Sequence, residues 1–167
     1  MMHGAIYAVM KTEGELQARL RGWINNTIIF FILCYALTTM ATLLYVPHMA
    51  ARVRAHPWLF SLAVLNILAI ANIPREMHHG RSWRAFLSSC LAMIALMTLF
   101  GLEMYPNLVL SNPDPAHSLT IHNAASSHKT LGIMLTIALI GIPAVLAYTI
   151  SIYWIFRGKV RLTRASY

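Results

Sequence analysis

The sequence is poor in charged residues. Lys, Arg, Asp and Glu make up 11% of its 167 residues, and only five of them are acidic, whereas a soluble domain carries about 25% charged residues. Hydrophobic residues account for 58% of the chain. The composition therefore excludes an ordinary water-soluble domain and predicts an integral membrane protein.

Cysteine and recognisable catalytic motifs are scarce as well. Cys34 and Cys90 each fall inside an apolar run without a CxxC-type neighbour, so we expect buried thiols rather than a disulfide or metal pair. GxSxG, HExxH, Walker and GxGxxG patterns are absent. The first ten residues lack the basic start of a cleavable signal peptide. We therefore assign no catalytic, cofactor-binding or metal-binding residue from the sequence.

What the chain does contain is long apolar runs. Residues 131–156 include no acid, base or histidine, and about 20 apolar residues suffice to cross a bilayer as a helix. Similar runs lie at about 24–46, 57–74 and 85–102. The sequence predicts an all-α integral membrane bundle with four transmembrane helices and a short N-terminal helix stub, and Pro143 should kink the last helix near Gly141.

The segments between these runs predict the orientation. Ten of the 13 Lys and Arg residues lie in 11–21, 75–84 and 157–164, and such residues concentrate in cytoplasmic loops. We expect a single transmembrane domain, 1–167, with a helix tail and cytoplasmic segment at 1–22, a long external loop at 103–130 and a basic cytoplasmic tail at 157–167. The net charge of +8 is thus explained without nucleic-acid binding.

The eight histidines are candidate haem or metal ligands. Five are expected on the outer side, two on the inner side and one in the stub, so none lies in the middle of a span: His48, His56, His117, His122 and His128 outside, His78 and His79 inside, and His3 in the stub. Interfacial and loop histidines are the favoured interpretation, and a haem-binding membrane cytochrome is the alternative.

Polar residues in or beside the spans leave a second alternative. A small four-helix transporter would need polar groups around a midplane cavity, and the candidates are Asn66, Asn72, Thr38 and Thr42, which suffice equally for helix packing. Glu103 is the one acid at a span end; it is interpreted as a solvated end charge, with a proton exit or quinol site as the alternative.

Two stretches resemble subunit II of cytochrome bd-type quinol oxidases. The first is HGAIY at 3–7, leading into KTEGELQAR at 11–19. The second comprises MYPN at 104–107, SLTIHNAASS at 118–127 and KTL at 129–131, followed by the closing helix through 148–156. The resemblance covers essentially the whole chain but only the C-terminal half of the family.

The resemblance implies a bacterial terminal oxidase of the respiratory chain in the cytoplasmic membrane. Such a complex oxidises ubiquinol or menaquinol and reduces oxygen to water. Its subunit I holds the b- and d-type haems and the main quinol site. Subunit II is then a haem-free accessory subunit, not catalytic alone, whose expected partners are subunit I, membrane lipids and a structural quinone. Because the half of the family with the acids linked to proton entry has no counterpart here, no catalytic residue is carried over.

Overall fold

A computed structural model describes residues 1–46, 56–112 and 114–160 of the chain. Its helices and strands, in order, are α1 (Met2–Lys11), α2 (Gly14–Tyr45), α4 (Trp58–His78), α5 (Ser82–Met104), β1 (Asn107–Val109), the 3-10 helix η1 (Pro115–His117), β2 (Leu119–Thr120) and α6 (His128–Ile155). Two compact units result, one of Met1–Glu103 with the tail from Lys159 and one of Met104–Gly158.

Four of the helices, α2, α4, α5 and α6, are long and apolar enough to cross a membrane. The prediction of an all-α bundle with four spans and a short N-terminal helix is therefore confirmed. The predicted bounds were too narrow in places: α2 begins at Gly14 and α4 continues to His78, because polar turns outside the apolar run remain helical. α6 is continuous across Pro143, and the kink near Gly141 stays a prediction, as does the single-domain organisation.

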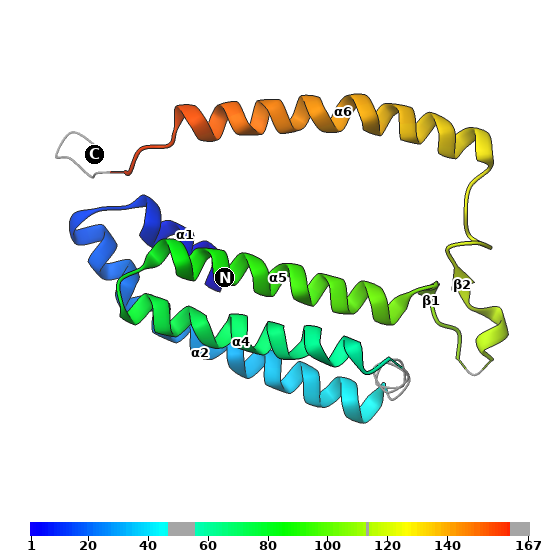
Figure 1. Ribbon diagram of the computed structural model, residues 1–167, viewed down its shortest axis with the longest axis horizontal. Helices are drawn as coiled ribbons and strands as arrows, with labels where there is room; N and C mark the ends of the chain where they lie inside the picture. Colours follow the sequence, from blue (N-terminus) through cyan, green and yellow to red (C-terminus); the bar gives the residue numbers. More distant parts are fainter. Residues whose placement is uncertain (47–55, 113, 161–167) are drawn as a thin grey trace. The chain divides into compact units, whose positions relative to one another are not determined.

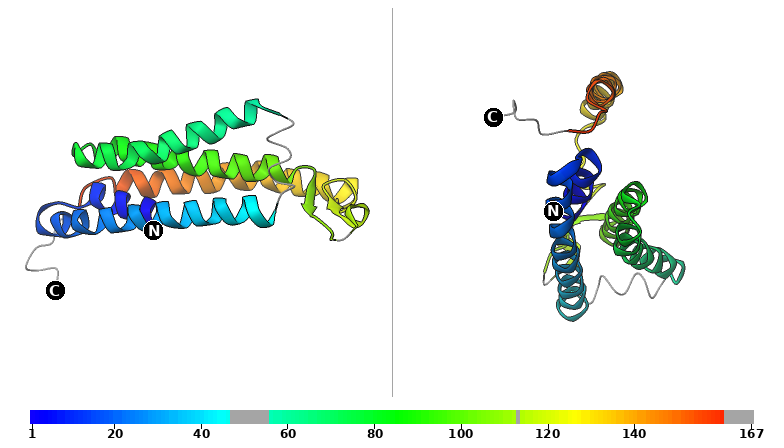
Figure 2. Two further views of the ribbon diagram at one scale, coloured as in Figure 1. Left: turned by 90° about the horizontal axis from the view of Figure 1, so that it is seen from below. Right: turned by 90° about the vertical axis from the view of Figure 1, so that its left-hand side faces the viewer.

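The first unit is held together by small and branched apolar side chains. Figures 1 and 2 show α2, α4 and α5 side by side, with α1 folded back near the start of α2. One buried cluster joins all four helices and contains Met2, Ile6, Val9, Ile24, Ile28, Ile73 and Ala85. A second, made of Ala69, Ile70 and Ala92, joins α4 to α5. Alanine at these contacts allows close approach of the helix backbones, as membrane bundles require.

The turn between α4 and α5 is a Schellman motif. Gly80 has φ +72°, and its N–H donates to the carbonyl of Met77, while the N–H of Arg81 donates to the carbonyl of Glu76 at 2.9 Å. Glycine adopts this left-handed conformation without strain. The motif ends α4 at His78 and allows α5 to begin at Ser82.

The second unit starts with a hydrogen-bonded loop. β1 and β2 pair antiparallel, with Asn107 opposite Thr120. Asn123 Oδ1 accepts from the Thr120 N–H at 2.6 Å, and Thr120 Oγ1 accepts from the Asn123 N–H at 3.1 Å. Ser127 then caps α6. The polar residues of the SLTIHNAASS stretch thus satisfy one another's backbone groups, which explains why a loop rich in Ser and Asn is ordered here.

Candidate functional site

The most distinctive polar residue of the first unit is Glu76, which the sequence placed in a loop after a span ending at 74. The structure instead places it in the last turn of α4, where the residue is only 6% exposed. A signal for this existed: Ala69, Ile73 and Glu76 follow a helical i, i+4, i+7 spacing and are all buried. Because the predicted span ended at residue 74, Glu76 was assigned to a loop, and a buried acid in the last turn of α4 was not predicted.

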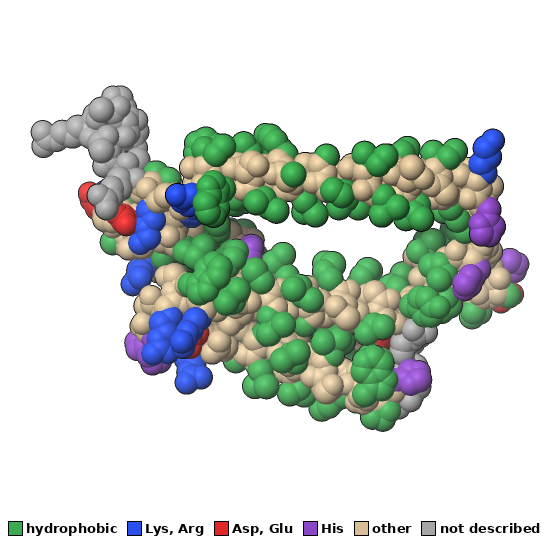
Figure 3. All heavy atoms as spheres, turned by 45° about the horizontal axis from the view of Figure 1, so that its top comes forward, with side chains coloured by type: hydrophobic (Ala, Val, Ile, Leu, Met, Phe, Trp, Pro, Cys, Tyr) green, Lys and Arg blue, Asp and Glu red, His purple; other side chains and the backbone are tan. Residues whose placement is uncertain are grey.

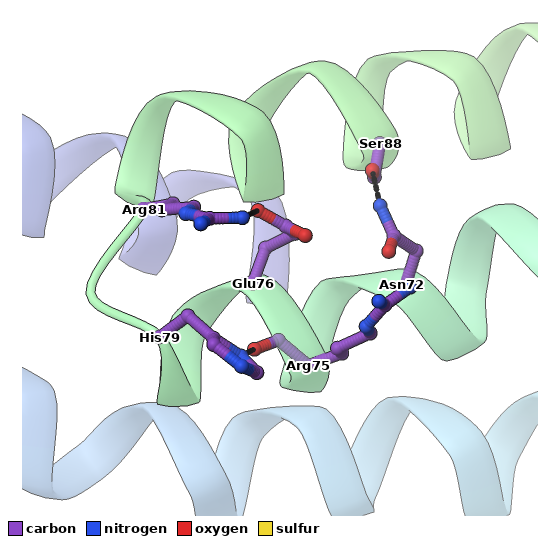
Figure 4. Close-up of polar contacts among 6 residues, drawn as sticks. All are labelled: Asn72, Arg75, Glu76, His79, Arg81 and Ser88. Carbon is purple, nitrogen blue, oxygen red and sulfur yellow. Dashed lines mark hydrogen bonds and ion pairs between the residues drawn. The ribbon is translucent and has the colours of Figure 1, made fainter.

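Arg81, at the end of the α4–α5 connection and just before α5, is the ion-pair partner of Glu76. Its Nη1 lies 3.9 Å from Glu76 Oε2, and Figure 4 shows the guanidinium pointing at the carboxylate. The separation is too long for a hydrogen bond, and this buried oxygen has none within the described part of the chain. On the neighbouring turn, His79 Nδ1 lies 2.8 Å from the carbonyl of Arg75; Nδ1 must be the donor, because a carbonyl only accepts.

Deeper in the unit, two asparagines of α4 bond to neighbouring helices. Asn72 Nδ2 donates to Ser88 Oγ of α5 at 2.8 Å (Figure 4), and Asn66 Nδ2 donates to Tyr35 Oη of α2 at 3.3 Å. Asn66 is fully buried. These contacts place both asparagines in helix packing, one of the two roles considered for them.

The threonines considered beside them behave differently. Thr38 Oγ1 donates to the carbonyl of Cys34 at 2.7 Å, and Thr42 Oγ1 donates to the carbonyl of Thr38 at 2.9 Å. Both hydroxyls therefore donate their hydrogen bonds to backbone carbonyls of α2 itself, as threonines of membrane helices commonly do. The four candidate transport residues thus divide into two that bridge helices and two that bond to their own.

The contact of His3, which was expected only in the N-terminal stub, was not predicted from the sequence. Its Nδ1 lies 2.8 Å from Ser89 Oγ of α5, and its ring stacks on Phe86 with centroids 4.8 Å apart. Ser89 Oγ donates its only proton to the carbonyl of Phe86 at 2.7 Å, so the Nδ1 of His3 acts as the donor. A contact across 86 residues of sequence leaves no local signal, which is why reasoning along the chain missed it.

The other candidate residues do not gather. Within the described residues, no group of three or more His, Cys, Asp and Glu side chains could hold a metal ion. His56, His78, His79, His117, His122 and His128 are exposed, and His48 lies outside the described residues. A three-ligand metal group is therefore not formed within the described residues, and the haem-binding alternative stays a prediction.

Two expectations about single residues need correction. Cys34 is exposed and Cys90 is half-buried, and both are free thiols; the prediction of a buried thiol is wrong for Cys34, because α2 turns it away from the two core clusters. Both carboxylate oxygens of Glu103 are buried, which differs from the predicted solvated end charge. Glu103 takes part in interactions within the chain.

Comparison with known proteins identifies the family. The sequence profile described as cytochrome bd terminal oxidase subunit II matches residues 1–156. Cytochrome bd-I ubiquinol oxidase subunit 2 of Escherichia coli K12 is 27% identical over an alignment that covers 94% of this chain and 48% of the relative. A probable cytochrome oxidase subunit 2 of Haemophilus influenzae is 33% identical, over 62% of this chain and 27% of the relative.

The chain thus spans about half the length, or less, of the curated relatives it matches. The match includes both stretches that carried the resemblance, and it includes α1, α2, α4, α5 and α6, the helices that the structure describes. Because the family profile accounts for 156 of the 167 residues, this chain belongs to the family of subunit II of cytochrome bd terminal oxidases.

Proposed function

We propose that this chain is a haem-free accessory part of a cytochrome bd quinol oxidase, which supports quinol oxidation and oxygen reduction to water by a partner subunit. The family match over residues 1–156 is the observation that carries the proposal. In this assignment the partner, subunit I, supplies the b- and d-type haems, and the chain is not catalytic alone. The complex would reside in the bacterial cytoplasmic membrane, with either ubiquinol or menaquinol as the reductant.

The polar contacts of the first unit support an accessory role. The bonds of His3, Asn66 and Asn72 are made to side chains of other helices. Each bond joins two helices, so these groups act in assembly rather than in presenting ligands. Polar pairs of this kind specify which helices pack together where lipid supplies no hydrophobic drive between them.

The apolar surface supports the partner assignment. Only Ile24 and Ile28 of the 32 residues of α2 are buried, and Phe30, Leu33 and Leu37 on this helix are more than half exposed. A membrane-spanning surface of this kind is covered by lipid or by another protein. Subunit I, membrane lipids and a structural quinone are the proposed occupants.

Co-purification tests the proposal. The chain, tagged at its C-terminus, is expressed with subunit I of the same genome and purified in mild detergent. We expect a haem-bearing partner in stoichiometric amount, with quinol-dependent oxygen consumption. The same tagged chain expressed without subunit I is the matched control, and it should show neither haem absorbance nor turnover.

Two results would count against the proposal. Recovery of the chain without any haem protein, from membranes that contain active subunit I, would remove the partner assignment. Quinol turnover by the chain alone would remove the accessory role.

A further inference from the structure

A small pocket lies between α2 and α4, apart from the contacts described above. It has a volume of about 160 Å³ and is lined by Arg21, Ile24, Asn25, Pro74, Met77 and His78. One water molecule accounts for roughly 30 Å³ of liquid volume, so the pocket can hold a group the size of a phosphate. All six residues belong to the first unit.

The rim of the pocket consists of hydrogen-bond donors. Arg21 and Asn25 stand one turn apart on α2, and His78 faces them from the last turn of α4. All three side chains are exposed, and no acidic residue lines the pocket. A guanidinium, an amide and an imidazole together provide the charge and the donors that bind phosphate oxygens.

Arg21 is available for such a ligand. Within the described part of the chain its guanidinium takes part in no ion pair, whereas Arg19, two residues earlier on α2, is paired with Glu15 at 2.7 Å. Figure 3 shows basic and histidine side chains gathered at this end of the first unit. The local field therefore favours an anion beside Arg21.

The floor of the pocket distinguishes a lipid phosphate from a free one. Ile24 is buried, and Pro74 and Met77 are half-buried. From this floor an apolar track continues along both helices toward the middle of the spans: Ile29 and Ile32 follow Asn25 at helical spacing on α2, and Ala71 and Ile67 precede Pro74 on α4, all of them exposed. A ligand with a phosphate at one end and acyl chains at the other matches this order of surfaces.

We propose that the pocket is a binding site for the phosphate headgroup of an anionic phospholipid, with Arg21 as the charged contact, Asn25 and His78 as further donors, and the acyl chains lying along α2 and α4. Basic pockets between membrane helices are recognised sites for such headgroups. The residues that line the site all belong to α2 and α4, and the site does not depend on the proposed oxidase role.

Native mass spectrometry of the purified chain in neutral detergent tests the site. The probes are phosphatidylglycerol and phosphatidylcholine with the same acyl chains. We expect phosphatidylglycerol to be retained in preference, and Arg21→Gln to weaken its retention about fivefold. Arg84→Gln is the matched control, because it removes the same charge from an exposed residue of α5 outside the pocket, and it should change retention less than twofold.

Asn25→Ala separates a defined site from diffuse attraction, because it leaves the net charge unchanged. We expect it to weaken phosphatidylglycerol retention as well, and it carries the test if Arg21→Gln lowers the helical circular dichroism signal. Equal retention of the two lipids, equal losses in the two arginine variants, or full retention by Asn25→Ala would overturn the proposal. Displacement of the lipid by millimolar inorganic phosphate would show a site for the free anion and would overturn the lipid assignment. Because subunit I is absent from the experiment, its failure leaves the oxidase proposal untouched.

Discussion

Arg81 contacts Glu76 at the end of α4 through both a backbone hydrogen bond and a side-chain ion pair. The backbone N–H of Arg81 donates to the Glu76 carbonyl at 2.9 Å, and its Nη1 lies 3.9 Å from Oε2 of the same residue. The first link fixes the path of the turn, and the second compensates a carboxylate with an 8% exposed side chain. A buried acid therefore depends on the turn geometry that Gly80 makes possible.

Arg81→Gln should destabilise the first unit, because it leaves the Glu76 carboxylate buried without its counter-charge. The Arg81 side chain is 54% exposed, so solvent screening limits the loss to about 1 kcal/mol. The measurement is reversible unfolding of the purified chain in mixed micelles, followed by circular dichroism. Arg84→Gln, which has no carboxylate partner in the described part of the chain, should leave the midpoint unchanged; equal shifts in both variants would contradict the role of the ion pair.

Gly80→Ala should also destabilise the chain, by about 1 kcal/mol, because a Cβ strains the backbone at φ +72° although no atom lies within 4 Å of it. The control is Gly101→Ala, inside α5, where a Cβ likewise meets open space and φ is not positive. There alanine should raise stability by about 0.5 kcal/mol. The same unfolding assay measures both, and effects of the same sign would count against the turn conformation.

Asn72 and Ser88 should show energetic coupling across the α4–α5 contact. Their hydrogen bond of 2.8 Å is of a type worth roughly 0.6 kcal/mol in membrane bundles. A double-mutant cycle with Asn72→Ala and Ser88→Ala measures it. The control is a second cycle that combines Thr38→Val with Ser88→Ala. Thr38 donates its hydrogen bond within α2 and should therefore not couple to Ser88. Coupling near zero in the first cycle would show that the bond does not form in solution.

These contacts also show where sequence reasoning succeeds and fails. The spans were predictable because an apolar run of bilayer length has to be helical. The burial of Glu76 was not predicted, because polar residues after an apolar run do not by themselves indicate that the helix continues. Its spacing of three residues from Ile73 is nevertheless a helical spacing, and it indicated a shared face. The pairing of His3 with Ser89 was beyond prediction, because it depends on how α1 folds back against α5.

Ile73→Ala should be more costly than truncation of an exposed isoleucine. Ile73 is fully buried where α1, α2, α4 and α5 meet, whereas Ile94 on α5 is 63% exposed. Loss of packed methyl groups at the buried position leaves a cavity and should lower stability by ~2 kcal/mol. Ile94→Ala creates no cavity and should have little effect in the isolated chain. The unfolding midpoints in micelles compare the two, and equal losses would show that the cluster around Ile73 is not the core.

The C-terminal tail should lie on the cytoplasmic side, on the same side as the α1–α2 junction. The structure ties the two together: the Val160 N–H donates to the Lys11 carbonyl at 2.7 Å, and Lys159 Nζ lies 3.4 Å from Glu13 Oε1. Both segments are also among the Lys- and Arg-rich ones, which are retained in the cytoplasm.

Fusion after Tyr167 to a fluorescent protein that folds only in the cytoplasm should therefore give fluorescence, and fusion to a phosphatase that is active only outside should give no activity. Phosphatase fusion after residue 112 is the control and should be active. An active phosphatase after Tyr167 would invert the topology, and it would place the junction at Lys11 outside as well, because the tail and the junction are hydrogen-bonded to each other.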